Sequence, residues 1–166
     1  MTSSDTQTIL VVEDDLSWQT MLTDLCRSAG FQVVQAFDAQ AACHQIDSSV
    51  SRPILAIVDL KLQSSALEQE YAGLQLLTTL RDRDMHTIVV SGNIPAVQDV
   101  LIGRAEIRHL VDKAHFATAE AFGREVFLPW VREAVTYAQA ARQAEGLLPE
   151  QQQRLQALDL PPDALP

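Results

Sequence analysis

The stretch Ile9-Leu10-Val11-Val12-Glu13-Asp14-Asp15 decides how the rest of this sequence is interpreted. Its first four residues form a short, continuous apolar run, which is typical of a strand buried on both faces of a parallel sheet. Acidic residues follow at once, so Glu13 and Asp14 are expected at the end of that strand. Ligands bind at the carboxyl ends of the strands in an open α/β sheet. The stretch therefore predicts a buried parallel sheet with an acidic ligand site at its edge.

Further apolar runs follow the first, and helical segments alternate with them along the chain. The predicted strands are residues 9–12, 31–36, 54–58, 87–90 and 107–111. In the segment after the first strand, apolar residues recur at helical spacing, namely Trp18, Leu22, Leu25 and Ala29. Gly30 then predicts a helix end, Asp38 a helix cap, and Pro95 the first turn of a later helix. This alternation predicts an α/β fold with a doubly wound parallel sheet and helices on both faces.

Polar residues also follow three later strands of the predicted sheet. Asp59 follows 54–58, Ser91 follows 87–90, and Lys113 comes just after 107–111. Each alone is typical of a helix cap, a turn or a solvated side chain, but parallel strand ends converge on one edge. Carboxylates there can bind Mg²⁺, and a lone carboxylate can attack phosphorus. A lysine and a hydroxyl can contact phosphoryl oxygens, so the set predicts a site for a divalent cation and a phosphoryl group.

Composition bounds the function classes that remain. The chain has 166 residues and a formal net charge of −10, which argues against direct contact with nucleic acid or with anionic membranes. Residues 1–8 are polar and no apolar run approaches a membrane span, so a cytoplasmic protein is expected. Cys26 and Cys43 lack the spacing of a zinc site and are interpreted as reduced, structural thiols.

Over roughly residues 7–143, the sequence resembles the receiver domain of two-component response regulators. The matching segments are Ile9 to Asp15, Ala56-Ile57-Val58-Asp59-Leu60-Lys61-Leu62, Gly73-Leu74-Gln75-Leu76-Leu77, Ile88-Val89-Val90-Ser91-Gly92 and Val111-Asp112-Lys113. The resemblance implies a flavodoxin-like, five-stranded parallel sheet of order 2-1-3-4-5 with an extended C-terminal helix. It also implies three regions: a flexible N-terminus (1–6), the receiver domain (7–143) and a C-terminal tail (144–166).

The resemblance implies a role for each residue of the acidic cluster. Asp59 would accept a phosphoryl group from a phosphohistidine of a sensor histidine kinase or phosphotransfer protein. Mg²⁺ would be bound by Asp59, directly by Asp14, through water by Glu13, and by the backbone carbonyl of Lys61. Such a chain is a signalling phosphoprotein in a phosphorelay, and no conventional enzyme, because it catalyses only its own phosphorylation and dephosphorylation.

In the same resemblance Ser91 is the switch hydroxyl and Lys113 contacts the phosphoryl group, but the sequence departs from the family near both. Family members usually carry proline after a cis bond where this chain has Ala114. A cis bond before a non-proline residue costs about 3 kcal/mol, so the isomer of this bond, and with it the usual position of Lys113, stay open. Leu110 occupies the place of the usual aromatic switch residue. The polar segment 63–72 is longer than usual and is interpreted as a surface loop or a lid.

The last third predicts a helix from Phe116 to Gln143 that is kinked or restarted at Pro129. Within it, Val131, Val135 and Ala138 form an apolar stripe at heptad-like spacing. The stripe would dock on the domain itself, on a second copy in a homodimer, or on a partner helix. With no output domain after residue 143, the signal would leave through contact with an unidentified protein.

Three classes of function fit the sequence. The first is a single-domain response regulator that is phosphorylated on Asp59. The second is a receiver-like binding or dimerisation module that works without phosphorylation, which Ala114 and Leu110 favour. The third is a hydrolase or phosphatase on the same edge, for which no further acid–base residue is evident. A nucleotide-binding domain is disfavoured because no glycine-rich loop follows the first strand.

Overall fold

The computed structural model describes residues 6–48, 52–62, 72–92, 94–118 and 121–145. In these residues five strands form one parallel sheet of order β2-β1-β3-β4-β5. The strands are β1 Thr8–Val12, β2 Gln32–Ala36, β3 Leu55–Val58, β4 His86–Ser91 and β5 Ile107–Asp112. The doubly wound, flavodoxin-like sheet is therefore confirmed, and every predicted strand is present with ends shifted by at most one residue.

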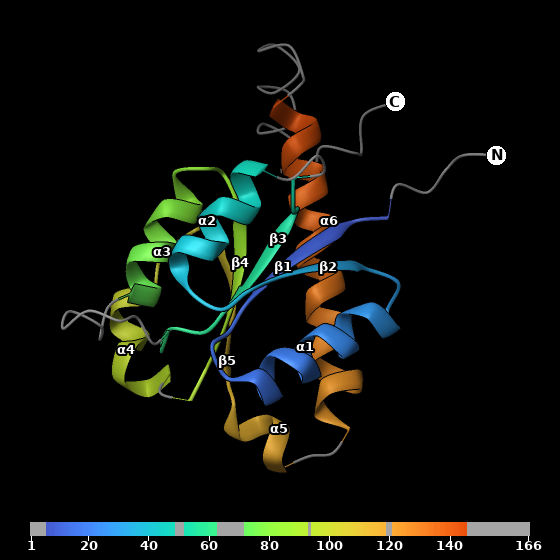
Figure 1. Cartoon of the computed structure of the whole chain (residues 1–166), viewed down its shortest axis with the longest axis vertical. Coiled ribbons are helices and arrows are strands. Elements are labelled where there is room, and N and C mark those ends of the chain that lie inside the picture. Colours follow the sequence, from blue (N-terminus) through green and yellow to red (C-terminus); the bar gives the residue numbers. More distant parts are fainter. Residues whose placement is uncertain (1–5, 49–51, 63–71, 93, 119–120, 146–166) are drawn as a thin grey trace.

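Helices cover both faces of the sheet (Figure 1). One face carries α2 Ala39–Ser48, α3 Ala72–Arg81 and α4 Ile94–Leu101, and the other carries α1 Leu16–Ser28 and α6 Leu128–Glu145. Successive strand residues point to opposite faces, so Leu10 and Val12 enter one core while Ile9 and Val11 enter the other. Both faces are thus apolar, which explains the continuous hydrophobic runs. Within the described ranges, no helix is long and apolar enough to cross a membrane.

The buried face of α1 differs from the predicted apolar stripe. The buried residues of this helix are Gln19, Leu22, Thr23 and Cys26. Trp18, Leu25 and Ala29 are only partly buried. A polar residue replaces an apolar one at the core because the Gln19 side-chain amide donates to two backbone carbonyls, those of Glu13 at 3.1 Å and Ala36 at 3.0 Å. The spacing predicted the helix correctly but gave no sign that Gln19 is buried, because its partners come from separate strand ends.

The C-terminal helical region restarts close to Pro129, as predicted. A short α5, Ala114–Thr118, precedes a single π-helical turn over Gly123–Phe127, and α6 begins at Leu128. The backbone N–H of Leu128 donates to the carbonyl of Gly123, five residues back. Pro129 is then the second residue of α6, where a missing N–H costs little, so the π-turn and the proline together mark the restart.

The apolar stripe of α6 docks on the domain itself. Val131, Val135 and Ala138 have exposed fractions of 0%, 4% and 2% and belong to the core that contains Ile9, Val11 and Phe127. Of the three surfaces predicted for the stripe, the domain itself is confirmed, and these residues do not form an interface with another molecule in this fold because the sheet and α1 cover their side chains. The stripe consequently gives no support for a homodimer. The predicted C-terminal tail, residues 144–166, lies outside the described residues from position 146 onward.

His86 makes the stability of this fold sensitive to mild acid. It is the first residue of β4 and therefore lies at the amino-terminal edge of the sheet, opposite the acidic cluster. Its ring contacts that of Tyr137 edge-on, with the ring centroids 5.0 Å apart. Its Nδ1 is buried without a hydrogen-bond partner among the described residues. Burial, with the positive charges of Arg108 and Arg142, lowers the pKa of His86 despite the opposing influence of Glu106.

Because the pKa of His86 is lower in the folded protein, the unfolded chain binds more protons below about pH 6.5. The contribution of His86 to the free energy of unfolding should therefore fall as the pH drops from 7.5 to 5.5, whereas that of Glu13, whose pKa is raised to about 7, should rise over the same interval. The expected result is a difference: acidification should change the stability of wild type less favourably than that of His86→Gln. Denaturant unfolding of both proteins at the two pH values measures this difference. His44→Gln, at an exposed position of α2, controls for the loss of a histidine as such. An unchanged pH dependence in His86→Gln would contradict the prediction.

Candidate functional site

The register of the sheet brings the predicted strand-end residues together. Val12 pairs with Val58, so Glu13 and Asp59 follow side by side at the carboxyl edge. On the other side Ser91 pairs with Asp112, and the backbone N–H of Lys113 donates to the carbonyl of Ser91 at 3.1 Å. Predicted residues from four separate segments therefore lie at one edge, which is the topological reason for the site.

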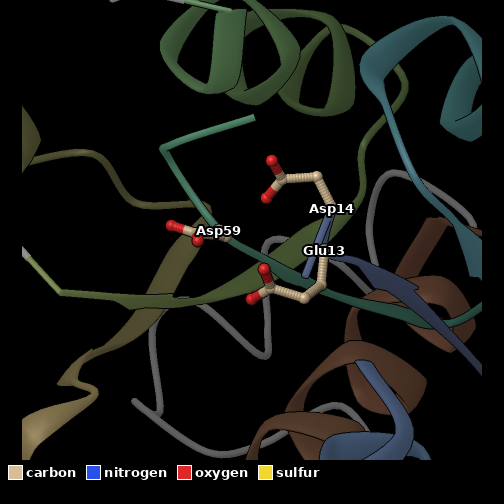
Figure 2. Close-up of side chains that lie close together, drawn as sticks. All are labelled: Glu13, Asp14 and Asp59. Atoms are coloured by element: carbon tan, nitrogen blue, oxygen red, sulfur yellow. The ribbon is translucent and has the colours of Figure 1, made fainter. Parts of the chain in front are cut away.

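Three carboxylates form the centre of this edge (Figure 2). Glu13, Asp14 and Asp59 each offer an oxygen, and these oxygens all lie within 4.8 Å of one another. Glu13 and Asp59 are only 1% and 5% exposed. Oxygen-rich clusters of this kind suit Mg²⁺, which takes carboxylate ligands and keeps several waters. The three residues therefore have the donor atoms and the proximity for one divalent cation.

Lys113 reaches this cluster from the end of β5. Its Nζ lies 2.7 Å from Oδ2 of Asp59 and 2.7 Å from Oε2 of Glu13. Every peptide bond in the described residues is trans, including the bond to Ala114. The Ala114 N–H donates to Oδ1 of Asp112 at 2.8 Å, which supports the start of α5. The bond is therefore trans, and Lys113 reaches the acidic cluster although no proline follows it.

The charges at this edge do not balance within the described residues. Burial raises the pKa of Glu13 to about 7, and the charge of Asp59 adds to this effect, while Lys113 and the N–H of Asp15 oppose it. Burial alone would lower the pKa of Lys113, but its contacts with Asp59 and Glu13 outweigh burial and raise it. One lysine thus faces three carboxylates, and a bound cation would offset the remaining negative charge.

Lys61 contributes its main chain to the site. Its backbone N–H donates to Oδ1 of Asp59 at 3.0 Å, while its side chain is exposed. Asp59 is therefore held on both oxygens, by Lys61 on one and by Lys113 on the other. The sequence predicted a different contact for this backbone, from the Lys61 carbonyl to the metal, and that contact stays a prediction.

Three residues of the first helical turn support the site and were missed at the sequence level. Asp15 caps α1, with its Oδ1 accepting from the N–H of Trp18 at 3.0 Å. Gln19 links the ends of β1 and β2 through the two hydrogen bonds described above. The ring centroid of Trp18 lies 4.8 Å from Nζ of Lys113. The available signal was the position of Trp18 and Gln19 four and five residues after Asp14, in the first turn of the predicted helix.

The position of the usual aromatic switch residue is occupied by a core leucine. Leu110 is partly buried and packs against the core beneath α2, α3 and α4. Its neighbour His109 instead stacks on Trp130 of α6, with ring centroids 5.0 Å apart. Most of the polar segment 63–72 lies outside the described residues, so its interpretation as a lid stays a prediction.

Comparison with known proteins identifies the fold. No family model and no curated protein matches the sequence. Among solved structures, a CheY-like response regulator receiver domain protein from Methanospirillum hungatei JF-1 has 20% identity and a TM-score of 0.65, covering 81% of this chain and 98% of that one. The signal receiver domain of an HD domain-containing protein from Pseudomonas fluorescens Pf-5 has 19% identity and a TM-score of 0.64, with 81% and 98% covered.

A third similar structure was solved with a metal and a phosphoryl mimic. The response regulator protein TrrA from Thermotoga maritima, in complex with Mg²⁺-BeF, has 18% identity and a TM-score of 0.60, covering 77% of this chain and 98% of that one. At these identities the comparisons establish the fold alone. The chain has the CheY-like fold of response regulator receiver domains over most of its length.

Proposed function

We propose that this chain is a receiver domain that is phosphorylated on Asp59 in the presence of Mg²⁺. The supporting observation is the environment of the Asp59 carboxylate. One oxygen accepts from the backbone of Lys61 at 3.0 Å and the other from Lys113 at 2.7 Å, and two further carboxylates lie within 4.8 Å. This arrangement orients a buried carboxylate beside a cation site and a lysine, which phosphoryl transfer requires.

In the proposed reaction, an oxygen of Asp59 attacks the phosphorus of a phosphohistidine. A P–O bond forms, the P–N bond to the donor imidazole breaks, and the imidazole leaves with the bonding electrons. Lys113 would turn from the carboxylate toward a phosphoryl oxygen, and Ser91, buried at the end of β4, would donate to another. The donor would be a sensor histidine kinase or a phosphotransfer protein in the cytoplasm.

Mg²⁺ would be held by Asp14 and Asp59 directly, by Glu13 through water, and by the backbone carbonyl of Lys61. When bound, the ion neutralises charge that develops on the transferred phosphoryl group. The cluster fits such an ion because three carboxylates offer oxygens within 4.8 Å of one another, and carboxylate oxygens are the ligands that Mg²⁺ prefers. TrrA, which has the same fold, was solved in complex with Mg²⁺-BeF, and this supports Mg²⁺ as the ion by analogy.

The proposed output is a contact with another protein, because phosphorylation in such a domain biases an equilibrium between two conformations. Residues 7–143 would form the receiver unit. Leu110 stands in the place of an aromatic switch residue. It would respond to phosphorylation by repacking in the core, because it has no ring to rotate. Catalysis would be limited to the protein's own phosphorylation and dephosphorylation.

Purified protein incubated with acetyl phosphate and Mg²⁺ should acquire the mass of one phosphoryl group. Asp59→Asn should abolish the adduct, because an amide is no nucleophile toward phosphorus, and chelation of Mg²⁺ should abolish it in the wild type. Intact mass spectrometry measures the adduct, and size-exclusion chromatography with beryllofluoride shows whether assembly changes.

The matched control is Asp38→Asn. Asp38 also follows a strand at this edge, but its carboxylate caps α2 by accepting from the N–H of Ala41 at 2.7 Å, a role that asparagine retains. This variant should form the adduct normally. A folded wild-type protein that neither forms the adduct nor binds beryllofluoride would favour the phosphorylation-independent binding module.

A further inference from the structure

The position of Lys113 needs a physical explanation beyond its own turn. A lysine side chain is long and flexible, so holding its ammonium at one point costs side-chain conformational entropy. Here the following residue is Ala114 in a trans bond, and so no proline ring restrains the turn. Nevertheless Nζ lies 2.7 Å from carboxylate oxygens of both Asp59 and Glu13. Another element must help to hold the side chain in this direction.

The indole of Trp18 lies against the ammonium of Lys113. The distance from Nζ to the ring centroid is 4.8 Å, inside the range of about 6 Å over which cation–π attraction acts. The Lys113 side chain is only 14% exposed, so water screens the contact little. Trp18 itself is fixed at the start of α1 by the hydrogen bond from its N–H to Asp15. The contact therefore links α1 to the end of β5.

A second set of contacts holds the indole in place. The ring of Phe116 meets Trp18 edge-on, with centroids 5.5 Å apart and an angle of 86°. The Phe116 N–H donates to the carbonyl of Lys113 at 3.1 Å, so Phe116 belongs to the turn that Lys113 begins. Phe116 also packs on Phe127, whose side chain is fully buried. Lys113 is thus enclosed between the indole above its ammonium and a turn anchored in the core.

We propose that Trp18 is the positioning residue for Lys113. Its indole face holds the ammonium toward Asp59 and Glu13, in a turn that has alanine where the resembling domains usually have proline. In this assignment Trp18 acts only through Lys113. The consequence for phosphoryl binding rests on the proposed function, whereas the positioning contact itself does not.

The alternative is that Trp18 only fills space between α1 and α5. A space-filling role predicts a loss of stability that is independent of Lys113. A positioning role predicts that replacing Trp18 lowers stability only while the Lys113 ammonium is present. It also predicts that Trp18→Phe, which keeps an aromatic face but not the full indole, loses less than Trp18→Leu. Trp130 offers a matched control, because it packs on Phe122 of the same aromatic cluster and stacks on His109, away from the acidic edge.

The first measurement needs no phosphoryl chemistry. In the full chain, NMR signals of the Lys113 ε-methylene protons should be shifted upfield by the indole, and Trp18→Leu should remove that shift while Trp130→Leu keeps it. A double-mutant cycle of Trp18→Leu and Lys113→Met in denaturant unfolding should show coupling equivalent to about a two- to thirtyfold change in the folding equilibrium. Zero coupling, or an unshifted Lys113 signal in the wild type, overturns the proposal.

The second measurement is the affinity for beryllofluoride with Mg²⁺, followed by fluorine NMR. Trp18→Leu should weaken binding about tenfold, Trp18→Phe less, and Trp130→Leu not at all, in keeping with one lost cation–π contact. Equal weakening in Trp18→Leu and Trp130→Leu overturns the positioning role in favour of space filling. If wild-type protein binds no beryllofluoride, the proposed function fails, and the NMR shift and the unfolding cycle alone decide whether Trp18 positions Lys113.

Discussion

Replacing Lys113 with methionine is expected to lower the free energy of unfolding by about 3 kcal/mol in the absence of metal. The lysine is the cation that lies 2.7 Å from both Glu13 and Asp59, and these carboxylates are almost completely buried. Methionine keeps a similar shape but leaves the buried carboxylates without that charge. Denaturant unfolding of wild type and variant at pH 7.5, with a chelator present, measures the difference.

Added Mg²⁺ should recover part of this stability, because the ion supplies the missing positive charge among the three carboxylates. The rate of adduct formation from acetyl phosphate should nevertheless fall by about a hundredfold, since a preorganised donor to the phosphoryl oxygens is gone. Lys61→Met is the matched control: that lysine contacts Asp59 through its backbone and its side chain is exposed, so both properties should be nearly unchanged. Unaltered stability of Lys113→Met without metal would mean that the ion pairs contribute nothing net.

Gly73→Ala is expected to be the most damaging small substitution in the fold, costing about 3 kcal/mol or more. A Cβ at this position would lie 2.4 Å from both the Cα and the carbonyl oxygen of Leu60 and 2.7 Å from its carbonyl carbon. These are backbone atoms of the residue directly after Asp59, so no side-chain rotation can relieve the overlap. Either α3 or the end of β3 must move, and β3 carries Asp59.

The consequence of Gly73→Ala should therefore extend to the site. Thermal or denaturant unfolding measures the loss of stability, and beryllofluoride binding at a temperature where the variant is folded measures the displacement of Asp59. Gly92→Ala is the control, because a Cβ there meets nothing within 4 Å even though Gly92 lies beside Ser91. A stable Gly73→Ala variant with normal binding would show that α3 can shift without disturbing β3.

Much of the fold and the site could be predicted because each depends on local patterns. Strands buried on both faces appear as continuous apolar runs, and so all five were placed to within one residue. The acidic cluster followed from topology alone, since residues directly after parallel strands converge at one edge. Glu13, Asp14, Asp59 and Lys113 meet there as expected, whatever the exact packing of the helices.

Predictions failed where the outcome depends on contacts between distant elements. The apolar spacing of α1 favoured Trp18 as a core residue, yet Gln19 is buried because it can satisfy two strand-end carbonyls at once. The heptad-like stripe of α6 could equally have faced another molecule, and only its packing on the sheet shows that it does not. Spacing identifies which residues share a face, but the surface that covers the face is a property of the assembled domain.

By itself, the sequence determined the parallel sheet and the chemistry available at its edge, because alternation of strands and helices and the residues that end each strand are local facts. The strand order came from the resemblance to receiver domains. Only the tertiary structure decided how Lys113 is held. Its direction depends on the indole of Trp18, which lies 95 positions earlier in the chain (113 − 18), and on Phe116 in its own turn. A cation–π contact acts over a few ångströms, so it exists only once the helix after β1 and the end of β5 are packed together.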